Sequence, residues 1–104
     1  PKQLEMELRY EKALLRERQG KFFEAFTDMR VVMDYNLANG RHNLWYDVPI
    51  LARLHAREGN ASQGLELFEK LLPDEPPDHL PEVGAFYHLT RLELLHGSNL
   101  TNRG

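Results

Sequence analysis

The sequence predicts an all-α fold built from repeated pairs of helices. Three glycines, Gly20, Gly59 and Gly97, are separated by 39 and 38 residues, and each follows a segment with helical periodicity. Aligned on these glycines, three small residues coincide, and so do three leucines: Ala13, Ala52 and Thr90, and Leu15, Leu54 and Leu92. The one β-prone run, residues 31–33, lies inside a helical pattern, so no strand is predicted.

The first pair of helices is expected over residues 3–19 and 22–37. Apolar residues at helical spacing and many good helix formers define the first helix. Gly20 ends it, because glycine accepts the left-handed conformation that closes a helix. The second helix ends at Asn39 and Gly40.

The second pair is expected over residues 47–58 and 61–72. Pro49 fits the first turn of the third helix, where no amide hydrogen is needed, and Asp47 can cap that helix. Asn60 and Gln63 resemble a capping box at the start of the fourth helix. Residues 73–81 hold four of the six prolines and are expected to form a loop.

A fifth helix is expected over residues 81–96, followed by a flexible polar tail at 98–104. The chain then forms a single domain, residues 1–104, with repeat units at about 3–40, 44–77 and 80–97.

Composition excludes several classes of protein. Hydrophobic residues make up 41% of the chain and charged residues 28%, so neither disorder nor a membrane span is indicated. There is no cysteine, which excludes a disulfide scaffold. The net charge of −3 argues against direct nucleic-acid binding. Because the chain shows no apolar signal region, we expect an intracellular protein, cytoplasmic or nuclear.

The repeat resembles the tetratricopeptide repeat family. That unit is a helix pair with small residues where the helices cross, a glycine at the turn, an aromatic residue in the second helix and a closing proline. The second unit matches this pattern best, at Leu51, Ala52, Gly59, Gly64, Phe68, Leu71 and Pro76. The first unit keeps Ala13, Gly20 and Ala25 but has Met29 for the aromatic residue, and the third unit has only its first helix.

Two features depart from the family. The period is longer than the ~34 residues of the standard repeat, with the extra residues at 36–43 and 73–80. The aromatic residue usual in the first helix is replaced by Arg16, His55 and Glu93. Other helix-pair solenoids with longer repeats therefore remain open.

The resemblance implies a right-handed helix-pair solenoid of about five helices, or two and a half repeats. Since about three repeats usually make a stable array, we expect either a fragment of a longer array or a unit that stacks on itself.

The family binds partners in a concave groove formed by the first helices of its pairs. That pattern gives three tyrosines, four arginines and a leucine as groove residues: Tyr10, Leu14, Arg18, Tyr46, Arg53, Arg57, Tyr87 and Arg91. Tyrosine and arginine are enriched at binding hot spots. The alternative is that the arginines are solvated or paired with glutamates, while the tyrosines pack between repeats.

No arrangement for catalysis or metal binding is found. No two of the five histidines are three or four residues apart, and no nucleophile motif, phosphate loop or dinucleotide fingerprint occurs. Glu7 with Glu11, and Glu24 with Asp28, are interpreted as solvated faces, and Trp45 as a seal between repeats. We expect no catalytic residue, no metal and no cofactor.

The leading hypothesis is a non-catalytic protein-interaction module or scaffold that binds an acidic or amphipathic segment of another protein. One alternative is a small chaperone. The other is a homodimer formed through the fifth helix, which lacks a partner helix and carries four large apolar residues for the contact: Phe86, Leu89, Leu92 and Leu95.

Overall fold

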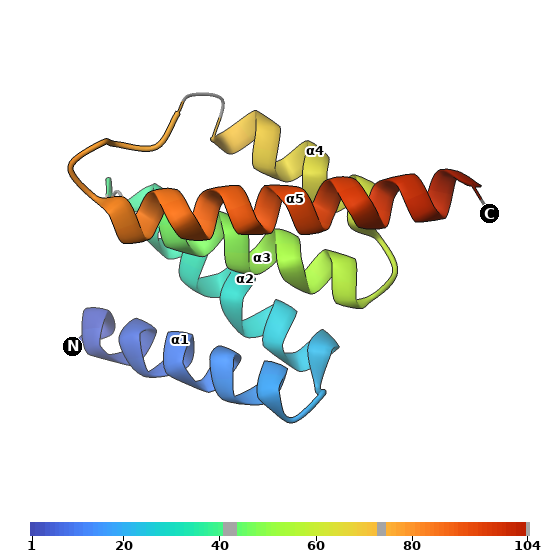
Figure 1. Ribbon diagram of the computed structural model, residues 1–104. Helices are drawn as coiled ribbons and strands as arrows, with labels where there is room; N and C mark the ends of the chain where they lie inside the picture. Colours follow the sequence, from blue (N-terminus) through green and yellow to red (C-terminus); the bar gives the residue numbers. More distant parts are fainter. Residues whose placement is uncertain (41–43, 73–74, 104) are drawn as a thin grey trace.

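The computed structural model describes residues 1–40, 44–72 and 75–103, the last four of them by backbone alone (Figure 1). These residues form five helices and no strand, which confirms the predicted all-α fold. The helices are α1 (Lys2–Arg18), α2 (Phe22–Ala38), α3 (Leu44–Arg57), α4 (Ala61–Leu71) and α5 (Pro81–Arg103).

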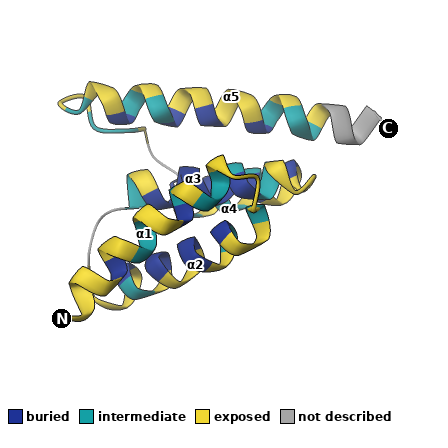
Figure 2. Cartoon of the chain, turned by 90° about the horizontal axis from the view of Figure 1, so that it is seen from below, coloured by how far each residue is buried: buried dark blue, intermediate teal, exposed yellow. Residues whose placement is uncertain are grey.

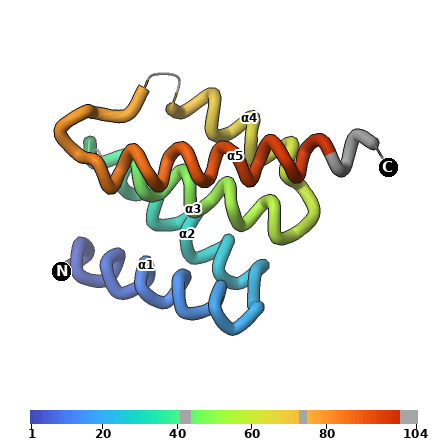
Figure 3. The backbone as a smooth tube through the Cα atoms, in the orientation of Figure 1, coloured from blue at the N-terminus to red at the C-terminus, as the bar shows by residue number. Residues whose placement is uncertain are grey.

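The helices form two antiparallel hairpins, α1–α2 and α3–α4, with α5 packed on the second hairpin. The helices α1, α3 and α5 run in one direction, and α2 and α4 return in the other, as the chain path in Figure 3 shows. The molecule measures 47 × 33 × 21 Å. The first helices of the successive units are therefore parallel, so they present equivalent ends to the same side of the molecule.

The turn of each hairpin has the same geometry. Gly20 and Gly59 have φ values of 78° and 82°, in the left-handed region that favours glycine. The residue after each glycine donates its amide to a carbonyl five residues back, from Lys21 to Arg16 and from Asn60 to His55, both at 2.8 Å. These bonds are those of a Schellman motif. The predicted stops at Gly20 and Gly59 are thus confirmed, in the same conformation.

The third glycine has a different role, and the predicted tail is wrong. Gly97 lies inside α5, which continues through residues 98–103. A Cβ atom added at Gly97 would lie 2.9 Å from the Cβ of Ala61, so glycine here lets α5 approach the start of α4. The Ser62 and Ser98 hydroxyls, 2.9 Å apart, join the same two helices. These contacts hold α5 against the start of α4 at Gly97 and Ser98.

The third helix begins three residues earlier than predicted. Because α3 starts at Leu44, Asp47 lies in its first turn rather than before it, and Pro49 lies in its interior. Pro49 cannot donate the usual hydrogen bond to the carbonyl of Trp45. Residues 41–43, part of the segment expected to lie between the first two units, are outside the described residues.

The core is centred on α3, which contributes seven buried residues, and it extends onto α4 and α5 (Figure 2). Phe68, Leu51, Leu54 and Leu94 are completely buried there. Gly64 allows the closest approach, because a Cβ atom added to it would lie 2.6 Å from the carbonyl oxygen of Ala52 and 2.9 Å from Leu94. The small residues predicted at the helix crossings are all buried: Ala13, Ala25, Ala52 and Gly64.

Candidate functional site

A buried carboxylate joins α1 to α2. Asp28 is 5% exposed and is paired with Arg16 and, at 3.5 Å, with Arg9. The interpretation of Glu24 and Asp28 as a solvated face is therefore wrong for Asp28. Arg16 occupies the position where the tetratricopeptide pattern has an aromatic residue, and here its guanidinium reaches across the pair instead.

A second ion pair links α1 to α3. Arg53 donates from Nε to Glu17 Oε2 at 2.7 Å and from its Nη2 atom to Oε1 at 2.5 Å. The same guanidinium lies 5.7 Å from the ring centre of Phe86. Arg53 is thus paired with a glutamate of the same chain, as the alternative interpretation of the arginines expected.

Tyr87 belongs to the core and not to a row of groove tyrosines. Its ring centre lies 4.8 Å from that of Phe68 and 5.7 Å from that of Trp45. Trp45, half-buried, packs at the contact between the second hairpin and α5. The two aromatic residues of α5 were assigned to the wrong sides of the helix. Phe86, assigned to self-association, is the one that lies beside Arg53.

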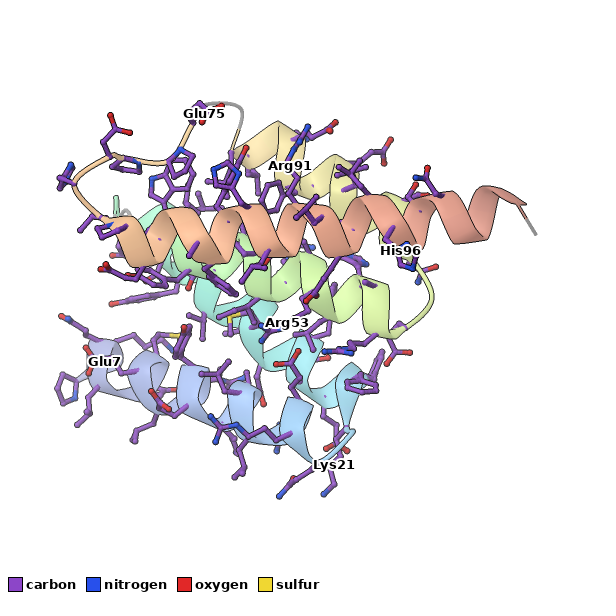
Figure 4. All side chains as sticks on the ribbon, viewed as in Figure 1. Glu7, Lys21, Arg53, Glu75, Arg91 and His96 are labelled. Atoms are coloured by element: carbon purple, nitrogen blue, oxygen red, sulfur yellow. The ribbon has the colours of Figure 1, made fainter. Side chains whose placement is uncertain are left out.

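The remaining groove residues do not form one continuous row. Arg18, Arg57 and Arg91 are exposed, and Leu14 is half-buried against the core. Figure 4 places Arg91 on the side of α5 toward α4 and Arg53 on the side toward α1. The four arginines assigned to the groove therefore do not share one face of the molecule.

Tyr10 and Tyr46 do come together, at a pocket of about 340 Å³ between the first turns of α1, the end of α2 and the start of α3. Tyr10 is half-buried, and Tyr46 is 41% exposed. Seven of the described residues line the pocket, two of them acidic: Met6, Glu7, Tyr10, Val32, Asn36, Tyr46 and Asp47. The pocket is the feature of the predicted groove that can receive a ligand group.

The polar centre of the pocket is Asp47, which is 1% exposed. Asn36 donates from its side-chain amide to Asp47 Oδ2 at 2.7 Å. Burial raises the pKa of Asp47, and the hydrogen bond from Asn36 opposes that rise. Burial, followed by the nearby charge of Asp47, raises the pKa of Tyr10. The pocket is therefore a region where burial makes negative charge costly.

Sequence reasoning missed Asn36 and Asp47 as site residues. Asn36 continues the buried stripe of α2 formed by Met29, Val32 and Met33, at spacings of three and four residues. A polar residue in such a stripe is the signal that could have identified it. Asp47 was interpreted as a helix cap because the start of α3 was placed too late.

No family model matches the chain, and no curated protein or solved structure is similar enough to it to count as a match. Among the described residues, no helix combines the length and apolar character that crossing a membrane requires. The same residues hold no group of three or more His, Cys, Asp or Glu side chains placed to bind a metal ion.

Replacing Asp47 with asparagine should stabilise the fold at neutral pH. The amide keeps an acceptor for Asn36 and removes a carboxylate whose ionised form is disfavoured by burial. A raised folded-state pKa gives stability that is present below the ordinary value of 3.8 and is lost as the pH rises through the folded value.

The increase in the free energy of unfolding caused by Asp47→Asn, measured by urea unfolding, should therefore be larger at pH 7 than at pH 3. Glu66→Gln, at an exposed position of α4, is the control and should show little change at either pH. A variant less stable than the natural chain at pH 7 would contradict the assigned cost of the carboxylate.

Proposed function

We propose that this protein is a non-catalytic interaction module that binds a segment of a partner polypeptide across α1 and α3. The observation that carries the proposal is the pocket between these helices, whose walls include Tyr10 and the exposed Tyr46. Rigid aromatic side chains beside a concavity are typical of sites that receive an anchor side chain from a partner. The resemblance to tetratricopeptide repeats supports the same face.

The proposed binding face has opposite charges at its two ends. Glu7 and Asp47 lie near the start of the parallel helices α1 and α3, and the exposed Arg18 and Arg57 lie at their ends. Residues 47 and 57 are separated by about 15 Å along a helix. An amphipathic partner segment would therefore bind in one orientation, with its acidic residues toward Arg18 and Arg57.

A library of displayed peptides, selected against the whole chain, tests the proposal. Selected peptides should lose most of their affinity for a Tyr46→Ala variant, at least tenfold if Tyr46 is a hot spot worth more than about 1.4 kcal/mol. Phe23→Ala is the matched control, because Phe23 is 76% exposed and does not line the pocket. Peptides that bind the Tyr46 variant as well as the natural chain would contradict the proposed face.

A second candidate function is self-association, and the outer face of α5 favours it. Leu89 and Leu92 are 62% and 63% exposed, on the side opposite the buried Val83 and Leu94. Phe86 and Leu95 are partly buried, so the four residues proposed for this contact reduce to two with large exposed areas. A chaperone would use the same leucines to cover a client.

If α5 forms a dimer, Leu89→Glu should abolish it, because a carboxylate at the centre of an apolar contact loses its water without gaining a partner. The measurement is the solution mass by light scattering across a concentration series. Leu8→Glu is the control, since Leu8 is 63% exposed on α1. A natural chain that stays monomeric at every concentration, or a dimer that persists in the Leu89 variant, would exclude this contact.

A further inference from the structure

In the described part of the chain, Asp28 and Glu17 are carboxylates held between helices and neutralised by arginines, whereas Asp47 is not. Asp28 has Arg9 and Arg16, and Glu17 has Arg53. Asp47 is the most deeply buried of the three acids, yet its partner is the neutral amide of Asn36. In the described part of the chain, no lysine or arginine forms an ion pair with Asp47.

The surroundings of Asp47 suit a cation from outside the chain. Asp47 lines the pocket together with a second acid, Glu7, and none of the described residues that line it is basic. The rings of Tyr10 and Tyr46 add aromatic surface, whose negative faces attract cations. Because a buried carboxylate without a charged partner is costly, a cation that enters the pocket gains both from Asp47 and from the rings.

We propose that this pocket holds the guanidinium group of an arginine side chain from the partner polypeptide, which faces Asp47 and lies against Tyr10 and Tyr46. The inference rests on the proposed function and specifies the chemistry of its anchor. Arginine is favoured over lysine because a guanidinium is planar, stacks on aromatic rings and is less strongly hydrated than an ammonium group. A positively charged side chain also fits the charge pattern of the binding face, because the pocket lies at the acidic end of that face.

The test is a nuclear magnetic resonance titration of the whole chain with N-acetyl-arginine methylamide. The citrulline analogue is the control probe, because it has nearly the same shape without the charge. We expect the arginine probe to bind roughly tenfold more tightly than citrulline, a difference of about 1.4 kcal/mol. The shifts should be concentrated at Tyr10, Asn36 and Tyr46.

A pair of matched variants separates local from overall charge. Glu7→Gln with Asp47→Asn should remove the preference for arginine over citrulline. Glu66→Gln with Glu69→Gln changes the net charge equally, but on exposed positions of α4, and should preserve that preference. A folded spectrum of the first variant shows that its loss of binding is local.

Three results would overturn the inference: equal binding of the arginine and citrulline probes, tighter binding of the corresponding lysine probe, or an unchanged preference in the Glu7 and Asp47 variant. Selected peptides that depend on Tyr46 but carry no basic residue would also overturn it, while leaving the proposed function intact. A failure to select any peptide that depends on Tyr46 counts instead against the proposed function, whatever the arginine probe does.

Discussion

Replacing Phe68 with alanine should lower the free energy of unfolding by about 3–5 kcal/mol, the usual cost of removing a buried phenylalanine ring. Phe68 is completely buried, and its ring contacts Tyr87 across the boundary between α4 and α5. The loss would take a large share of the ~5–15 kcal/mol that typically stabilises a domain. Urea unfolding followed by circular dichroism measures it.

The control for Phe68→Ala is Phe23→Ala, which removes the same atoms from a ring that is 76% exposed. Its cost should stay within about 0.5 kcal/mol, as for most surface substitutions. If the two variants lose similar stability, Phe68 does not hold α5 on the second hairpin, and the packing described for this region is wrong.

The second large effect is expected for Gly64→Ala, which should destabilise the fold by about 1–3 kcal/mol. The added Cβ atom would lie 2.6 Å from the carbonyl oxygen of Ala52, and a backbone atom cannot rotate away as a side chain can. Separating α4 from α3 would also disturb Leu94. The better helix propensity of alanine, worth up to ~1 kcal/mol, should not compensate for this clash.

The variant Gly84→Ala measures the effect of helix propensity without a clash. Gly84 also lies in a helix, but a Cβ atom there would meet nothing closer than Pro76 at 3.9 Å. This variant should be as stable as the natural chain or more stable by up to ~1 kcal/mol. Thermal unfolding of both variants would show opposite shifts, and a stabilised Gly64→Ala variant would disprove the close approach.

The helices could be predicted from sequence because each carries a strong local signal. Glycine at a left-handed position ends α1 and α3. Apolar residues at helical spacing predict which segments are helical. They do not give the buried side of α1, where Leu4, Leu8 and Leu15 are at least half exposed. Gly97 shows where such signals fail. Glycine serves both as a turn residue and as a residue of close approach, and only the contact with Ala61 decides between these roles.

The site was predicted less well, because its parts depend on contacts between helices. Tyr10 and Tyr46, assigned to the groove by the tetratricopeptide resemblance, line the same pocket. Tyr87 was misplaced by a shift of one residue along α5. Arg53 was predicted to bind a partner, but its guanidinium is paired with Glu17, 36 positions away in the sequence. A pattern in a single sequence does not show which acidic side chain pairs with which basic side chain.

The attachment of α1 has a consequence for how the pocket behaves over time. α1 contributes two buried residues, Met6 and Ala13, whereas α3 contributes seven. The contacts of α1 with α2 include the ion pairs of Arg9 and Arg16 with Asp28. Elements with few buried apolar contacts open first in native-state hydrogen exchange. Since α1 forms one wall of the pocket, we expect that wall to open more readily than the walls formed by α2 and α3. A bound side chain would therefore slow amide exchange in α1 far more than in α3.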